Sequence, residues 1–168
     1  MKIRFDPRCL TKKPPTNLRF WLLAGVAGSL FTGSAAAQSI VLDGRTTTNL
    51  SGQGSTTDIR TTTISGATGF NSFEKFGVSS GQTVNLHVPG GASNLVNVVS
   101  GSSRTEINGF LNSVKDGRIG GNVFLLNPNG ILVGANGVVN TGSITIATPT
   151  REFVNGILVG GAPSAAHT

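Results

Sequence analysis

Residues 122–147 read NVFLLNPNGILVGANGVVNTGSITIA and contain no charged residue. An uncharged run of this length is a candidate membrane span. However, NPNG at 127–130 and GANG at 134–137 divide it into apolar pieces of about five residues, far short of the roughly 20 that a spanning helix needs. The segment therefore predicts short strands joined by tight turns.

Short β-branched segments bounded by turn-forming residues recur along the rest of the sequence, and no window of a dozen residues has helical apolar spacing without a glycine. The Thr-rich segment 46–63 is expected to form polar strands, because its threonines alternate with Ile59 and Ile64; a low-complexity linker is the alternative. The expected apolar strands lie at 40–42, 61–64, 83–88, 95–99, 123–126, 131–133, 137–139 and 144–147.

Asn-Gly followed by two apolar residues occurs at Asn108, Asn129, Asn136 and Asn155, and the hexapeptide NGILVG of residues 129–134 returns unchanged at 155–160. The spacing is 21 residues from Asn108 to Asn129 and 26 from Asn129 to Asn155, which matches one coil of a β-solenoid. Asn136 then marks a second corner within a coil. The predicted fold is all-β, and a β-sandwich with Asn-Gly hairpins is the alternative.

The 13 Lys and Arg residues against 7 Asp and Glu give a net charge of +6, but six of the basic residues precede an apolar segment at 20–31. That segment is followed by an Ala-x-Ala sequence formed by Ala35 and Ala37. These features predict a secretory signal peptide over residues 1–37, with Gln38 as the first mature residue. A membrane anchor is the alternative, although the apolar core is short for one.

After this cleavage, the mature chain contains seven basic and six acidic residues, a nearly balanced charge. A nucleic-acid-binding surface is therefore not expected. The single Trp and the single Cys, Trp21 and Cys9, are removed with the signal peptide. Aromatic stacking platforms for sugars or bases are therefore not expected. The mature chain also has no disulfide partner, although it is destined for an oxidising compartment.

No catalytic, cofactor-binding or metal-binding constellation is expected in the sequence. His87 lies in the apolar alternation VNLHVP and His167 lies at the C-terminus, so a two-histidine metal site is not predicted. The acidic residues form no close pair, although carboxylates can meet across the face of a solenoid in glycan-cleaving enzymes. No glycine-rich phosphate-binding loop between a strand and a helix is present, and the chain is predicted not to be an enzyme.

Residues 120–143, GGNVFLLNPNGILVGANGVVNTGS, closely resemble the haemagglutination-activity domain at the N-terminus of filamentous-haemagglutinin-like exoproteins, which are exported by two-partner secretion (TPS). FNSFEKFGVSSGQTVNL at 70–86 resembles the Phe-rich segment of that family, and SGSSRTEINGFL at 100–111 resembles its Ser-x-Ile-x-Gly segment. The NPNGI motif of the family stands here at Asn127, Pro128, Asn129, Gly130 and Ile131.

This resemblance implies a right-handed parallel β-helix and a secretion domain over residues 38–168. It implies a domain that crosses the periplasm unfolded and is bound by the periplasmic domains of an outer-membrane β-barrel transporter. The domain then emerges at the cell surface or in the medium, where it folds first and templates further coils. Capture of extended strands by β-augmentation suits this role. The five NPNGI residues are the candidate site, as transporter contacts or as a structural turn.

The chain also departs from the family pattern. The second family motif, NPNL, is absent, and the 19-residue basic region before the apolar segment lacks the aromatic pattern of extended signal peptides. The family's domain continues with more coils and a passenger, so the β-helix is expected to be partial, and a host-cell target would belong to a passenger that this sequence does not contain. A stand-alone adhesin or carbohydrate-binding module and a secreted β-helix glycan-cleaving enzyme are the alternative functions.

Overall fold

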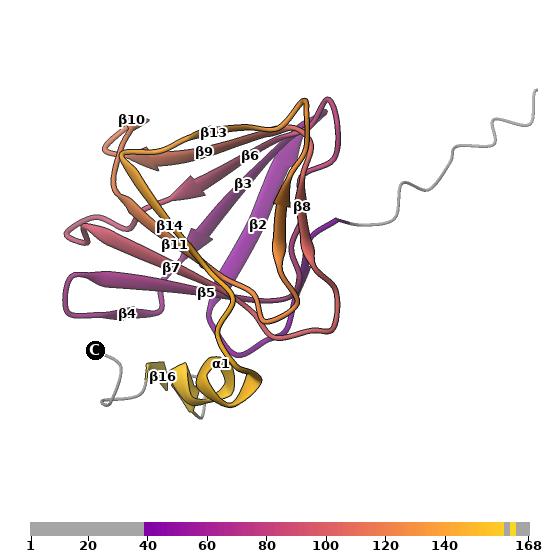
Figure 1. The fold of residues 1–168 in the computed structure, drawn as a ribbon. Coiled ribbons are helices and arrows are strands. Elements are labelled where there is room, and N and C mark those ends of the chain that lie inside the picture. The colour runs from indigo at the N-terminus through magenta and orange to yellow at the C-terminus, as the bar shows by residue number, and fades with distance from the viewer. Residues whose placement is uncertain (1–38, 160–161, 164–168) are drawn as a thin grey trace, which may run out of the picture. The chain divides into compact units, whose positions relative to one another are not determined.

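Parallel strands wind around three faces of a triangular coil, which Figure 1 shows nearly end-on. This computed structural model describes residues 39–159 and 162–163, all within one compact unit of the chain. The predicted cleavage site at Ala35, Ala37 and Gln38 lies outside the described residues, as does His167.

The first face, sheet 1, contains six strands. Its parallel members are β5 (Thr68–Lys75), β7 (Asn94–Val99), β11 (Asn122–Leu126) and β14 (Ser143–Ala147). Two short strands, β1 (Val41–Leu42) and β4 (Ile64–Ser65), pair antiparallel with β5.

The second face, sheet 2, also contains six strands. Its parallel members are β3 (Thr56–Thr61), β6 (Thr83–His87), β9 (Phe110–Lys115) and β13 (Val138–Asn140). The antiparallel strands β2 (Thr48–Gln53) and β10 (Arg118–Ile119) pair with β3 and β9. The third face, sheet 3, pairs β8 (Thr105–Ile107) with β12 (Ile131–Val133), and Val78 bridges to Ile107.

The chain order around these faces defines three coils. Coil one runs through β5, Val78 and β6, coil two through β7, β8 and β9, and coil three through β11, β12 and β13, after which β14 returns to sheet 1. The predicted all-β fold is thus confirmed as a β-solenoid of about three turns.

Apolar side chains at equivalent positions of successive coils form the core. In sheet 1, Leu95 pairs in register with Val123 and Val123 with Ile144, and all three contact the same buried cluster. Each coil alone cannot bury its inward side chains, so stacking of coils provides the main hydrophobic stabilisation.

The prediction of a coil corner at Asn155, in the second NGILVG hexapeptide, is wrong. Asn155 lies within a helix, α1 (Arg151–Ile157), rather than at a coil corner. Thr150 caps this helix, because its Oγ accepts a hydrogen bond from the Phe153 N–H at 3.3 Å. Val154 and Ile157 are buried against outward-facing residues of sheet 1, including Phe70 and Val98. The hairpin strands β15 (Leu158–Val159) and β16 (Ala162–Pro163) follow.

Two further differences concern the Thr-rich region. The polar strands expected within residues 46–63 are present as β2 and β3, but the predicted strand at 61–64 is wrong, because β3 ends at Thr61 and β4 begins at Ile64. The Thr61 side chain stabilises the turn between these two strands, because its Oγ1 donates to the Phe70 carbonyl at 2.7 Å and accepts from the Thr63 N–H at 3.0 Å.

No helix within residues 39–159 is long and apolar enough to span a membrane.

Candidate functional site

The NPNGI motif forms the corner between β11 and β12 in coil three. The Gly130 N–H donates to the Asn127 carbonyl at 3.1 Å, which closes a β-turn with Pro128 in its second position. The Asn127 Oδ1 also accepts from the Asn129 N–H at 2.9 Å. Gly130 has a φ of 95°, which a residue with a side chain adopts only under strain. The sequence therefore encodes the turn locally.

The side chain of Asn127 is fully buried and joins this corner to coil two. Its Nδ2 donates to the Thr105 Oγ1 at 3.0 Å and to the Ser103 carbonyl at 3.1 Å. Asn129 reaches the same loop, because its Nδ2 donates to the Gly101 carbonyl at 2.8 Å. The other motif residues, including Ile131, are partly buried. Within the fold, Asn127 thus acts as a clamp between coils and offers no side-chain surface to a partner.

Arg151, the first residue of α1, extends this network. Its guanidinium donates to the Asn129 Oδ1 at 2.7 Å and to the Gly101 and Ser100 carbonyls at 3.2 and 3.3 Å. One side chain therefore ties the helix to both the motif and the loop after β7. Arg151 was not among the site residues predicted from the sequence.

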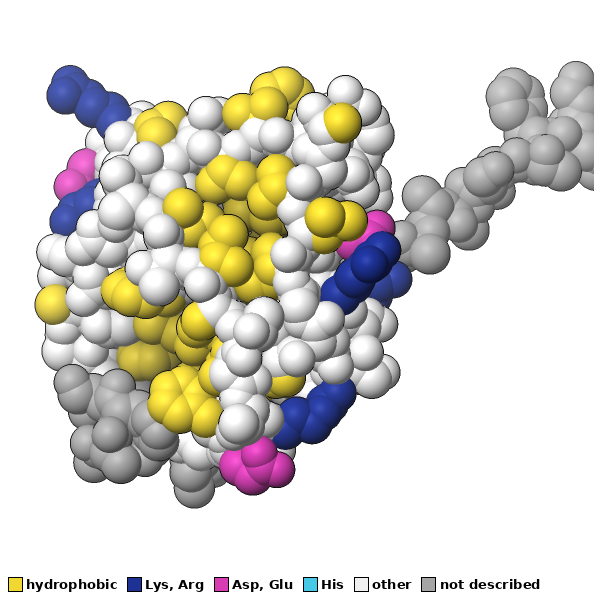
Figure 2. All heavy atoms as spheres, in the orientation of Figure 1, with side chains coloured by type: hydrophobic (Ala, Val, Ile, Leu, Met, Phe, Trp, Pro, Cys, Tyr) yellow, Lys and Arg dark blue, Asp and Glu magenta, His cyan; other side chains and the backbone are white. Residues whose placement is uncertain are grey.

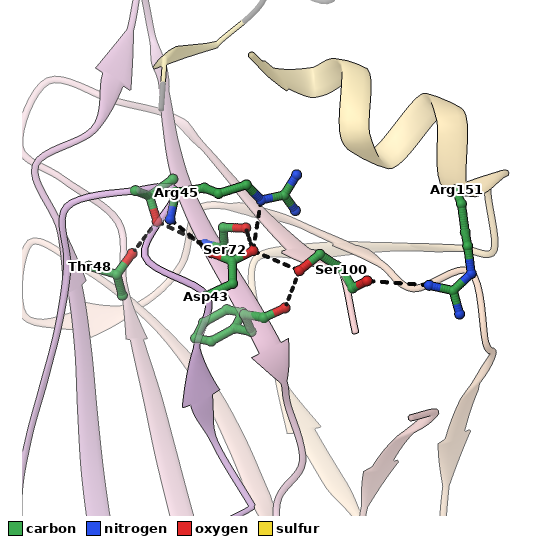
Figure 3. Close-up of polar contacts among 8 residues, drawn as sticks. Asp43, Arg45, Thr48, Ser72, Ser100 and Arg151 are labelled. Carbon is green, nitrogen blue, oxygen red and sulfur yellow. Dashed lines mark hydrogen bonds and ion pairs between the residues drawn. The ribbon is translucent and has the colours of Figure 1, made fainter. Parts of the chain in front are cut away.

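A second buried centre lies at Asp43, which Figure 3 shows beside Arg45, Ser72 and Ser100. Its Oδ2 accepts hydrogen bonds from the Ser72 Oγ at 2.5 Å, the Ser100 Oγ at 2.7 Å and the Arg45 Nε at 2.8 Å. Only 7% of the Asp43 side chain is exposed. Ser100 also contributes a carbonyl that Arg151 binds, and Arg151 in turn binds Asn129. A continuous series of hydrogen bonds therefore links Asp43, which follows β1, to the NPNGI corner.

The electrostatics of Asp43 follow from these contacts. Burial raises the pKa of Asp43, but the hydrogen bonds from Ser72, Arg45 and Ser100 outweigh this effect and leave the pKa below its ordinary value. The carboxylate is thus charged in the folded chain and serves as an acceptor for three segments that are distant in sequence.

We expect this site to make the domain acid-sensitive. A carboxyl group whose pKa is lower in the folded chain stabilises the fold above its ordinary pKa of 3.8, and that contribution disappears as pH falls through the lower folded value. In urea unfolding between pH 5 and pH 2, Asp43→Asn should therefore flatten the decline in stability with falling pH and lower stability at neutral pH. Equal slopes for the two proteins would contradict the assignment.

Sheet 2 carries a ladder of amides on its outer surface. The Nδ2 of Asn140 donates to Asn112, that of Asn112 to Asn85, and that of Asn85 to Asp58, at 2.9, 2.9 and 3.1 Å. His87 also contacts the Asp58 Oδ1 at 2.7 Å. The hydrogen bonds from His87 and Asn85 hold the pKa of Asp58 below its ordinary value. His87 therefore lies in a structural pair and has no neighbouring metal ligand set in the described part of the chain.

Two grooves lie on the surface of the described residues. One groove of about 460 Å³ lies against sheet 3, where Lys75, Arg104 and Glu106 line it. Another of about 360 Å³ lies between sheet 1 and α1, with Phe70, Val96 and Phe124 on its walls. The described residues contain no cluster of three His, Cys, Asp or Glu side chains suited to a metal ion.

Comparison with protein families gives one clear match. The family model described as TPS secretion domain matches residues 38–159, which include every strand of the solenoid and all five residues of the NPNGI corner. No curated protein matches the chain.

Proposed function

We infer, because this chain belongs to the TPS secretion domain family, that it is the N-terminal secretion domain of a two-partner-secretion exoprotein, bound on its way out by an outer-membrane transporter. Domains of this family are non-catalytic and serve export. The observation that carries the inference is the family match over residues 38–159, nearly the whole of the folded unit.

The geometry of the NPNGI corner supports capture of the domain before it folds. Asn127 is fully buried and hydrogen-bonded in the solenoid, so its side chain is available to a transporter only in the unfolded chain. Unfolded strand segments also have free backbone N–H and C=O groups, which the periplasmic domains of the transporter can bind by adding a strand to their own sheets. Folding outside the cell then withdraws these groups and makes release irreversible.

The signal peptide of residues 1–37, with cleavage between Ala37 and Gln38, is part of this proposal. It would deliver the chain to the periplasm, from which the transporter moves it across the outer membrane to the medium or the cell surface. Adhesion to a host cell would be a property of a passenger segment. Nucleic acid is not a partner in this scheme, because the mature chain has a nearly balanced charge.

A binding experiment tests this function directly. Mature chain diluted from urea into the purified periplasmic domains of the cognate transporter should bind them and refold more slowly than it does alone. The same chain, folded beforehand, should bind weakly or not at all, because its strands are already paired. Equal binding of both forms would contradict recognition of the unfolded chain, and no binding of either form would remove the transporter as a partner.

A further inference from the structure

Sheet 1 is apolar on its outer face, whereas the outer face of sheet 2 carries the amide ladder. The apolar side chains on the outer face of sheet 1 pack in a cluster of their own, separate from the core inside the coils. Helix α1 covers this outer cluster with Val154 and Ile157, which are only 1% and 4% exposed. The sheet residues of the outer cluster are Phe70, Val96, Val98 and Leu126.

The outer cluster spans all three coils. Phe70 belongs to β5 of coil one, Val98 to β7 of coil two and Leu126 to β11 of coil three. The groove beside α1 also has walls from three coils, because residues of β5, β7 and β11 line it together with Ile157. Figure 2, in the same orientation as Figure 1, shows apolar side chains gathered around α1 and the adjoining part of sheet 1. One helix of seven residues thus packs across coils that are stacked on one another.

Arg151 adds polar contacts between the same coils. Its guanidinium donates to the carbonyls of Ser100 and Gly101, between β7 and β8 of coil two, and to the Asn129 Oδ1, in the corner between β11 and β12 of coil three. Figure 3 shows the Arg151 side chain extending from α1 to Ser100, whose hydroxyl donates to Asp43. A planar guanidinium has several N–H donors in a fixed arrangement, so it can bind acceptors on two coils at once.

These contacts matter because coils of a solenoid are otherwise only weakly dependent on one another. Each coil contacts its nearest neighbours, so the stability of the stack is close to a sum of coil and interface terms, and one coil can open while the others stay folded. The contacts of α1 add a cost to such opening. If coil three opens, Asn129 separates from Arg151 and Leu126 leaves the outer cluster.

Helix α1 in turn depends on the coils. It has seven residues and includes Gly156, which is unfavourable inside a helix. Isolated helices shorter than about 12–15 residues are marginal in water, so α1 needs the outer face of sheet 1 to form. The coils and the helix therefore stabilise each other, which is the condition for cooperative folding.

We propose that α1 couples the three coils into one cooperative folding unit, with Arg151 as the residue that joins coil three to the other two. Coil three then does not open while coils one and two remain folded. For a chain exported unfolded, the unit is complete only after the chain has left the transporter as far as Ile157. This consequence for export rests on the proposed function, whereas the coupling is a property of the chain itself.

Pulsed hydrogen exchange at increasing urea concentrations, applied to the mature chain from Gln38 and resolved by segment, tests the coupling. In the wild type, β6 of coil one and β11 of coil three should lose protection at the same urea concentration, because coincident transitions mark a single cooperative unit. Arg151→Ala should move the midpoint of β11 about 1 M below that of β6, because coil three loses a hydrogen bond to a charged group. Arg118→Ala, at an exposed arginine of β10, should leave both midpoints coincident.

Val154→Asp tests the apolar part of the coupling. Val154 lies in the outer cluster and not in the core inside the coils, so the substitution should detach α1 and leave the solenoid folded. The midpoint of β11 should again fall below that of β6. Midpoints that fall together in both variants would mean that α1 stabilises the coils without coupling them, and would overturn the proposal. Separate midpoints in the wild type would also overturn it. Neither measurement involves the transporter, so this proposal and the proposed function can fail independently.

Discussion

Replacing Phe73 with alanine is expected to lower the free energy of unfolding by about 3–5 kcal/mol. Phe73 is fully buried, and its ring centroid lies 4.9 Å from that of Phe76. It is in register with Leu42 of β1 on one side and Val99 of β7 on the other, so the cavity would open between β1 and β7. Small domains are stable by about 5–15 kcal/mol, so this change removes a large share of the total.

Phe110→Ala provides the matched control for this experiment. Phe110 lies on β9 with 46% of its surface exposed, so the same substitution removes a side chain that packs little. Urea unfolding of the two variants, followed by circular dichroism at neutral pH, should show a large loss for Phe73→Ala and about 1 kcal/mol or less for Phe110→Ala. Comparable losses in the free energy of unfolding would mean that Phe73 contributes no more to the core than the half-exposed Phe110.

Asn127→Ala is expected to lower both the stability of the folded domain and the amount of protein that reaches the medium. The change removes the hydrogen bonds that the Asn127 side chain makes with the Asn129 N–H, the buried Thr105 hydroxyl and the Ser103 carbonyl. Leaving buried polar groups unpaired costs about 1–3 kcal/mol. In a host carrying the cognate transporter, processing after Ala37 should be unaffected, because the substitution is remote from that site in sequence.

Asn136→Ala separates the role of the NPNGI corner from that of the corner at Asn136. Asn136 is exposed, in contrast to the buried Asn127, so its replacement should leave stability and secretion near the wild-type level. If Asn127→Ala is secreted as well as the wild type, Asn127 has no recognition role. If the variant is secreted poorly and refolds slowly when purified, the corner acts through folding. Poor secretion with normal refolding would instead indicate direct contact with the transporter.

Local signals were sufficient to predict the NPNGI corner and the strand after it. Pro128 fixes the backbone at the second turn position, Gly130 accepts a positive φ, and the apolar run 131–133 forms β12 as expected. These residues determine their conformation through their own covalent geometry. The resemblance to a family supplied the handedness and the export role, which the turn chemistry does not contain.

The hexapeptide NGILVG shows where local reasoning fails. Its first copy forms a corner and a strand, whereas the first three residues of its second copy complete helix α1. The difference lies outside the hexapeptide: Pro128 precedes the first copy, and Thr150 caps a helix before the second. Sheet 1 then provides Phe70 and Val98 for the helix to cover, a contact that depends on the finished solenoid.

The Asp43 centre could not be predicted because its partners are distant in sequence. Ser72 and Ser100 lie 29 and 57 residues from Asp43, and only the stacking of β5 and β7 brings their hydroxyl groups together. A serine near the end of a strand has no distinguishing signal in a chain rich in serine. The register between coils, which sequence spacing alone did not determine, creates this site.

The ladder of Asn140, Asn112 and Asn85 gives the solenoid a polarity like that of a helix dipole. Each amide donates toward the N-terminus and accepts from the C-terminal side, so every rung can be followed by an identical one. Asp58 ends the series, because a carboxylate accepts hydrogen bonds and has no proton to pass on. Asp58, the first rung of the ladder, is therefore chemically unique, whereas the asparagine rungs that follow it are interchangeable. Whole coils could thus be duplicated or lost during evolution without disturbing the hydrogen bonds of the others, provided that the carboxylate rung is retained.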